Sequence, residues 1–124
     1  MTGKQKRILS FPEQFLWGAS VSHFQVEGNR TEIESRLSDW SKWTELTGKI
    51  EDGTNADSAC EMADRYKDDI DLLEELNLNT FRTSLNWAHL MPGSSGPGSK
   101  RAFDQDAVNY YKDFLGHLKE RGFK

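Results

Sequence analysis

The sequence has one cysteine, no long hydrophobic run and no excess of positive charge, and each shortage excludes a class of protein. With Cys60 alone, the chain forms no internal disulfide. No apolar run approaches the length that spans a membrane. The 16 basic residues are interspersed among 20 acidic ones, without the one-sided basic patch of a nucleic-acid-binding domain. We therefore expect neither a membrane nor a nucleic acid as a partner.

Signals for export, metals and cofactors are equally scarce. The start of the chain, MTGKQKRILSFPEQF, has basic residues but no apolar stretch behind them, which makes a poor secretion signal, so we expect a cytoplasmic location. The three histidines lack the spacing of a metal site. The glycines after Met91 lack the lysine and the helix start of a phosphate-binding loop. The sequence thus predicts no metal and no cofactor.

One segment in the middle of the chain repeats apolar residues at helical spacing. We expect this helix to be capped by Thr54 or Asn55, with Asp57 in its first turn and a left-handed Asn77 at its end. Cys60 would be a small buried residue on it. The apolar stripe consists of Ala59, Met62, Ala63, Tyr66, Ile70, Leu73 and Leu76.

A second helix and two strands complete the pattern. The helix is predicted from Asp104 to a stop at Gly122, and strands are predicted over Phe15–Val21 and Asn79–Trp87. A short helix is expected at Trp40–Leu46, inside the long loop after the first strand. Strands that alternate with amphipathic helices indicate an α/β fold with a parallel sheet. The stripe of the second helix is Val108, Tyr111, Leu115 and Leu118.

The run FLWGASVSHFQVEG, which begins at Phe15, mixes aromatic, small and polar residues in a way that a plain core strand does not need. It resembles the N-terminal signature of the family 1 glycoside hydrolases, the β-glucosidase and phospho-β-glucosidase family. It departs from that signature at His23, where the family usually has a small residue. The matching residues are Phe15, Trp17, Gly18, Ser20, Ser22, Phe24, Gln25, Glu27 and Gly28.

The resemblance continues through nearly the whole chain, in the same order as in the family. Trp40 and the run GKIEDG match a following element, and ADRYKDDIDLLEELNLNTFRTSLNW is similar to the first long helix and the second strand. In that strand Arg82, Ser84 and Trp87 are in register, whereas His89 stands where an arginine is common. The run VNYYKDFLGHLKERGFK resembles the second helix.

The resemblance implies a (β/α)₈ TIM barrel, of which residues 1–124 form the first two βα units. Such barrels contain about 250 residues, so this chain alone leaves the barrel incomplete. Family members are retaining β-glycosidases that hydrolyse terminal β-linked sugars with two glutamates, one in an NEP and one in an ENG setting. Neither tripeptide occurs here. We therefore expect a fragment of the catalytic domain that lacks both catalytic residues and is inactive by itself.

By the same resemblance, three residues belong to the sugar site. Gln25 would hold two hydroxyls of the glycone, because an amide both donates and accepts hydrogen bonds. Arg82 would support the nucleophilic glutamate, and Trp87 would shape the floor of the pocket. Glu27 is expected to be structural. The acidic pairs of the first long helix are expected to be solvated rather than catalytic, because adjacent helical residues point in different directions.

The implied partners are a β-glycoside or oligosaccharide and a complementing polypeptide that carries the rest of the barrel. Self-association is the other way to cover the two open sheet edges. An alternative hypothesis is a free-standing interaction or structural protein built from two βα units, without catalysis. The sequence leaves glucose, galactose and 6-phospho sugars open as substrates.

Overall fold

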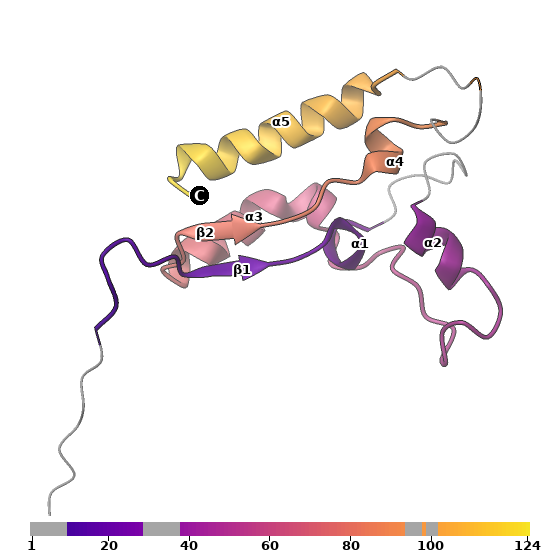
Figure 1. The fold of residues 1–124 in the computed structure, drawn as a ribbon, viewed down its shortest axis with the longest axis horizontal. Helices are drawn as coiled ribbons and strands as arrows, with labels where there is room; N and C mark the ends of the chain where they lie inside the picture. Colours follow the sequence, from indigo (N-terminus) through magenta and orange to yellow (C-terminus); the bar gives the residue numbers. More distant parts are fainter. Residues whose placement is uncertain (1–9, 29–37, 94–97, 99–101) are drawn as a thin grey trace, which may run out of the picture.

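The computed structural model describes residues 10–28, 38–93, 98 and 102–124, and within them it shows two successive strand–helix units (Figure 1). Strands β1 and β2 pair in parallel, with Ala19 opposite Phe81. The order along the chain confirms the expected α/β arrangement. The elements are β1 (Gly18–Ser20), α1 (His23–Val26), α2 (Asp39–Thr44), α3 (Met62–Glu75), β2 (Thr80–Arg82), α4 (Trp87–Leu90) and α5 (Gln105–Glu120).

Both strands are shorter than the sequence predicted, and side-chain hydrogen bonds join the two segments where the backbone ladder ends. Before β1, the Trp17 N–H donates to Asn79 Oδ1 at 2.9 Å and the Asn79 amide donates to the Phe15 carbonyl at 3.1 Å. Within the ladder, a Cβ on Gly18 would lie 2.4 Å from the Thr80 carbonyl oxygen, so only glycine permits this close approach.

The two long helices lie alongside each other against the strands, and the core is buried between them (Figure 1). Ile70 of α3 is 0% exposed and Phe114 of α5 is 1% exposed. From the sheet, Ala19 and Phe81 pack against this cluster. The expected stripe of α5 needs one correction, because Phe114 faces the core and Leu115 is exposed. The buried cluster is Met62, Tyr66, Ile70, Leu73, Leu90, Tyr111, Phe114 and Leu118.

Helix α3 begins later than predicted. Ala59 has φ 46° and Glu61 has φ 55°, and left-handed backbone at these two positions prevents a helix from starting earlier. Cys60 therefore lies in an exposed turn rather than on a buried helical face. Asp57 is not in a first helical turn either, and its N–H donates to Asn55 Oδ1 at 3.1 Å.

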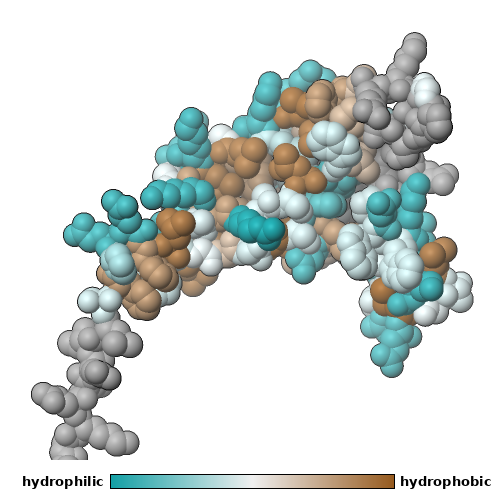
Figure 2. Space-filling view, viewed as in Figure 1, coloured by the Kyte–Doolittle hydropathy of each residue, from teal (hydrophilic) through white to brown (hydrophobic). Residues whose placement is uncertain are grey.

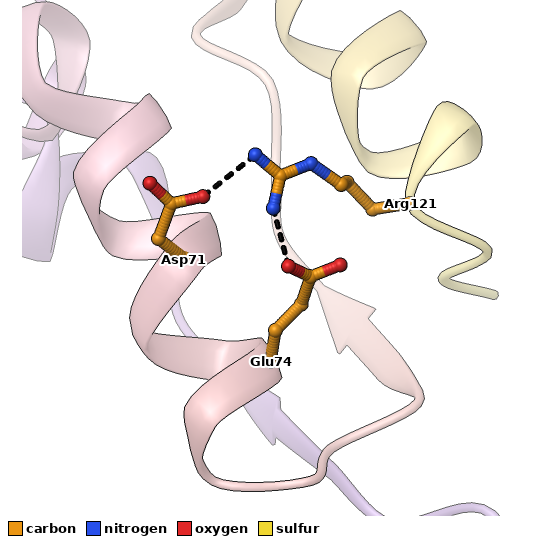
Figure 3. Close-up of polar contacts among 3 residues, drawn as sticks. All are labelled: Asp71, Glu74 and Arg121. Carbon is orange, nitrogen blue, oxygen red and sulfur yellow. Dashed lines mark hydrogen bonds and ion pairs between the residues drawn. The ribbon is translucent and has the colours of Figure 1, made fainter.

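Polar contacts tie α3 to the end of α5. Arg121, just after α5, forms ion pairs with Asp71 at 2.7 Å and with Glu74, both on α3 (Figure 3). The Glu74 carboxylate is therefore paired rather than simply solvated. The hydroxyl of Tyr66 donates to Asp113, and burial together with that carboxylate raises the pKa of Tyr66 to about 12.

The predicted ends of α3 and α5 are correct, unlike the predicted start of α3. Asn77, after α3, has φ 56°, and Gly122, after α5, has φ 81°, so both adopt the left-handed conformation expected of helix stops. At the start of α5, the Asp104 carboxylate caps the helix by accepting from the Ala107 N–H at 3.0 Å.

Large hydrophobic side chains also remain on the surface. On the face drawn in Figure 2, apolar side chains gather near the start of the described chain and again over the middle of the molecule. In the same part of the chain, the rings of Phe11, Phe15 and Trp17 contact one another with centroids 4.6 to 4.7 Å apart, and the three residues are 37 to 52% exposed. Among the described residues, no helix combines the length and the apolar character needed to cross a membrane.

Candidate sugar site at the strand ends

Polar side chains gather where the two parallel strands end. Ser20, the last residue of β1, is the register partner of Arg82, the last residue of β2. The Arg82 guanidinium donates to Ser20 Oγ at 3.1 Å, and the side chain is exposed. No ion pair of the described residues involves Arg82. Its charge is therefore held at the strand end by a neutral hydroxyl, with solvent around it.

Gln25 follows the same strand end, on the single turn of helix α1. Its Oε1 accepts hydrogen bonds from the Ser22 backbone N–H at 3.0 Å and from the Ser22 hydroxyl at 2.9 Å. The side chain thus caps the start of its own helix, and it is exposed. Helix α1, which carries Gln25, follows the carboxyl end of β1 (Figure 1), and no described contact joins Gln25 to Arg82.

Trp87 does not lie at a strand end, which corrects the predicted strand over Asn79–Trp87. Asn86 accepts from the Ala88 N–H at 3.1 Å and caps a one-turn helix, so Trp87 is the first residue of α4. The indole is 58% exposed and contacts Phe103 edge-on, with ring centroids 6.2 Å apart. Trp87 is available on the surface near β2, without a described contact to Gln25 or Arg82.

His23 joins the two strand ends. Its backbone N–H donates to Ser84 Oγ at 3.0 Å, and its ring Nδ1 lies 3.1 Å from the same oxygen. The two contacts connect the residue that opens α1 to the segment after β2. Partial burial lowers the pKa of His23 below its ordinary value of 6.5.

Glu27 lies beneath this edge and connects three segments of the chain. Its side chain is 5% exposed, and both carboxylate oxygens lie 3.0 Å from the Tyr111 hydroxyl of α5. That hydroxyl accepts from the Asn86 N–H at 2.7 Å. Burial and the neighbouring Glu27 charge raise the pKa of Tyr111 above its ordinary value. Helix α5 is thereby bonded to the loops that follow both strands.

The sequence pointed to Gln25 and Arg82 through the family signature, but it missed the contacts that hold their loops in place. Nothing in the local pattern pairs His23 with Ser84, because the two are far apart in the chain. Tyr111 was expected only as part of an apolar stripe, and its hydroxyl gave no separate signal. The one available clue was the departure from the family signature at position 23.

The described strand ends carry polar side chains but no pair of carboxylates for hydrolysis. Retaining glycoside hydrolysis needs two carboxyl groups about 5 to 5.5 Å apart across the sugar. The acid of the signature, Glu27, is buried against Tyr111. Among the residues that the structure describes, no cluster of three His, Cys, Asp or Glu side chains could hold a metal ion. The polar groups described near the strand ends are the Gln25 amide and the Arg82 guanidinium.

Comparison with known proteins finds relatives that match most of this chain. β-Glucosidase 42 of Arabidopsis thaliana is 33% identical over 93% of this chain, and the probable inactive β-glucosidase 14 of Oryza sativa subsp. japonica is 37% identical over 92%. The chain spans 23% and 21% of the length of these two relatives. It therefore corresponds to between a fifth and a quarter of each.

Solved structures give the same result for the fold. The family 1 β-glucosidase from Thermotoga maritima matches with a TM-score of 0.83 and 28% identity, over 94% of this chain and 26% of its own. That enzyme was also solved with cyclophellitol, in a structure that matches with a TM-score of 0.81. The fold is thus the first two βα units of a TIM barrel, as expected. Because the model of glycosyl hydrolase family 1 matches residues 8–124, the chain belongs to that family.

Proposed function

We propose that this chain is the N-terminal part of a retaining β-glycosidase that hydrolyses terminal β-linked sugars, and that it forms part of the glycone site. What supports the proposal is that Arg82 is the last residue of β2, parallel to β1, and that Gln25 lies on α1, the element that follows β1. TIM barrels build their active sites at the carboxyl ends of their strands. The Thermotoga maritima enzyme, whose structure matches this fold, was solved with cyclophellitol and with castanospermine.

Gln25 has the free bonding capacity that a sugar requires. Its carbonyl oxygen already accepts from Ser22, whereas its amide NH₂ has no hydrogen bond to a described residue. An amide nitrogen offers two donors, and adjacent sugar hydroxyls accept as well as donate. The bond to Ser22 fixes the rotamer, so the NH₂ group is presented to the ligand with little further loss of entropy.

Arg82 is suited to meet a carboxylate that another part of the protein supplies. A guanidinium keeps its charge at any relevant pH and can hold both oxygens of a carboxylate. Its present contact with Ser20 uses one Nη atom only. In the completed barrel we expect Arg82 to hold the nucleophilic glutamate ionised, and Trp87 to shape the floor of the pocket.

The rest of the barrel has to come from residues beyond this chain. Both strands of the described sheet have only one neighbour, so each leaves one edge open. We propose that a complementing polypeptide or a continuation of the chain covers these edges in the cytoplasm, and that the catalytic glutamates belong to it. By itself the 124-residue chain would bind sugar weakly and would not hydrolyse it.

The test is hydrolysis of a chromogenic aryl β-glucoside by the chain alone and by the chain mixed with a polypeptide that carries the remaining strands. We expect activity in the mixture only. Gln25→Ala should then lower kcat/KM roughly ten- to hundredfold, the value of one or two lost hydrogen bonds. The matched control is Gln105→Ala, which removes an exposed glutamine that bonds within α5, and it should leave the rate unchanged. Turnover by the chain alone would refute the proposal.

A second function, that of an interaction protein without catalysis, is favoured by one feature of the surface. Trp40 and Trp43 of α2 are 61% and 45% exposed, and such aromatic residues are typical of protein interfaces. One relative, the rice protein, is itself named as a probable inactive β-glucosidase. A mixture that stays inactive while the chain forms a stable dimer in sedimentation would support this second function over the first.

A further inference from the structure

The single turn of helix α1 is joined to other segments by few described hydrogen bonds. Before it, the Val21 N–H donates to the Arg82 carbonyl at 3.0 Å. After it, the Glu27 carboxylate accepts from the Tyr111 hydroxyl at 3.0 Å. Between these two points, Ser84 alone forms described hydrogen bonds to the turn from a distant part of the chain. Ser84 is therefore the polar anchor of α1.

The Ser84 hydroxyl contacts the first residue of α1 at two atoms. Its oxygen accepts from the His23 backbone N–H at 3.0 Å and lies 3.1 Å from the ring Nδ1. A hydroxyl has two lone pairs and one hydrogen, so it can accept from the N–H and also bond to the ring in either neutral tautomer. The other ring nitrogen, Nε2, is buried without a hydrogen bond to a described residue. Ser84 thus orients both the backbone and the ring of His23.

Two consecutive backbone donors at the start of α1 are satisfied by different parts of the chain. Donors at a helix start have no partner within the helix. The Ser22 N–H donates to Gln25 Oε1 at 3.0 Å. The next N–H, that of His23, donates to Ser84. The first bond fixes the Gln25 side chain on its own turn, and the second fixes the turn on the segment that follows β2.

We propose that Ser84 is a positioning residue of the sugar site, which holds α1 so that the Gln25 amide keeps a fixed place relative to Arg82. Ser84 lies two residues beyond Arg82, so one short segment carries both the guanidinium and the anchoring hydroxyl. The inference rests on the proposed role of Gln25 in sugar binding, but the placement of Gln25 is measurable without a sugar.

The first test is NMR on the full 124-residue chain labelled with nitrogen-15, without ligand. In the parent chain, the side-chain amide signals of Gln25 should differ from those of the exposed Gln14. Ser84→Ala should move them toward the Gln14 signals and speed exchange of the His23 amide about fivefold, the effect of one lost hydrogen bond. Ser84→Thr retains a hydroxyl and should restore both properties.

Thr83→Val is the matched control. It removes the neighbouring hydroxyl, which donates to the Ser84 carbonyl, and it should change neither signal. His23→Phe keeps the test decisive if Ser84→Ala does not fold. It retains the backbone bond to Ser84 and loses only the ring bond, so the Gln25 signals should move in the same direction by a smaller amount. Unchanged Gln25 signals in either folded variant would overturn the proposal.

The second test separates this inference from the proposed function. In the active mixture of the two polypeptides, Ser84→Ala should lower kcat/KM about tenfold. The double variant with Gln25→Ala should be no slower than Gln25→Ala alone, because Ser84 acts through Gln25. Losses that multiply would overturn the positioning role. A mixture without activity would refute the proposed function, and the Gln25 signals of the first test would still decide whether Ser84 positions that side chain.

Discussion

The layer between α3 and α5 and the edge at the strand ends are built by opposite means. In the helical layer, Ile70 and Phe114 are almost completely buried, and apolar contacts stabilise the packing. At the strand ends, Gln25 and Arg82 are exposed, and each is held by a hydrogen bond to a nearby serine. The layer between α3 and α5 is stabilised by the packing of its side chains against one another. The side chains at the strand ends retain hydrogen-bonding groups that a ligand or another part of the protein can use.

This difference separates the residues that stabilise the fold from those that we expect to bind sugar. Substitutions in the layer should lower the free energy of unfolding without changing the groups that contact a ligand. Substitutions at the strand ends should weaken sugar binding with little effect on the free energy of unfolding. Tyr111 stands between the two regions, because its ring is in the core and its hydroxyl reaches Glu27 under the edge.

The largest effect is expected in the helical layer. Ile70→Ala should lower the free energy of unfolding by about 2 to 5 kcal/mol, because it removes buried methyl groups and leaves a cavity. Leu72→Ala is the matched control, since Leu72 has the same number of carbons, lies on the same helix and is 54% exposed. It should cost less than about 1 kcal/mol, and urea unfolding measures both.

Ile70→Val keeps this comparison measurable if the alanine variant does not fold, with an expected loss of about 0.5 to 1.5 kcal/mol. Equal losses in Ile70→Ala and Leu72→Ala would show that the layer is not packed as described.

A smaller effect is expected where the two regions meet. Tyr111→Phe keeps the ring in the core but removes the hydroxyl that bonds Glu27 and Asn86, and it should cost about 1 to 3 kcal/mol. A double-mutant cycle with Glu27→Gln should give a coupling free energy of about 0.5 to 3 kcal/mol. Additive losses in the two single variants would show that the hydroxyl and the carboxylate do not interact.

The same contrast explains how far the sequence could predict the structure. Parallel strand–helix order, the start of α5 at Asp104 and the helix stops at Asn77 and Gly122 follow from local chemistry, and all were predicted. Helix α3 was predicted to begin too early, because the apolar spacing at Ala59 is helical while its backbone is left-handed. Spacing reports which face is apolar, but it does not report the dihedral angles of a tight turn.

The site was predictable only in part, for a physical reason. Gln25 belongs to the N-terminal family signature, and Arg82 belongs to the strand that resembles the second strand of the family. Their supports come from contacts between distant segments, such as His23 with Ser84, which no local pattern encodes. The second strand was predicted to extend to Trp87, because the residues from Asn79 onward favour strands. Asn86 instead caps a short helix, so the strand ends earlier.

The two regions should also lose stability at opposite ends of the pH range. In the layer, the pKa of Tyr66 rises from 10.0 to about 12, so the folded state holds that proton more tightly than the unfolded chain. Its contribution to stability is complete below pH 10 and is lost as the pH rises toward 12. At the edge, burial lowers the pKa of His23 below 6.5, so its contribution is present above pH 6.5 and is lost as the pH falls.

Unfolding by urea across this pH range tests both assignments with one substitution each. Tyr66→Phe should flatten the loss of stability between pH 10 and 12 and leave the acid side unchanged. His23→Phe should reduce the loss just below pH 6.5 and leave the alkaline side unchanged. Because Tyr111 also has a raised pKa, some alkaline slope should remain in Tyr66→Phe. An alkaline slope in Tyr66→Phe as steep as in the parent chain would mean that Tyr66 is ionised as easily in the folded state as in the unfolded one, which its burial and its bond to Asp113 contradict.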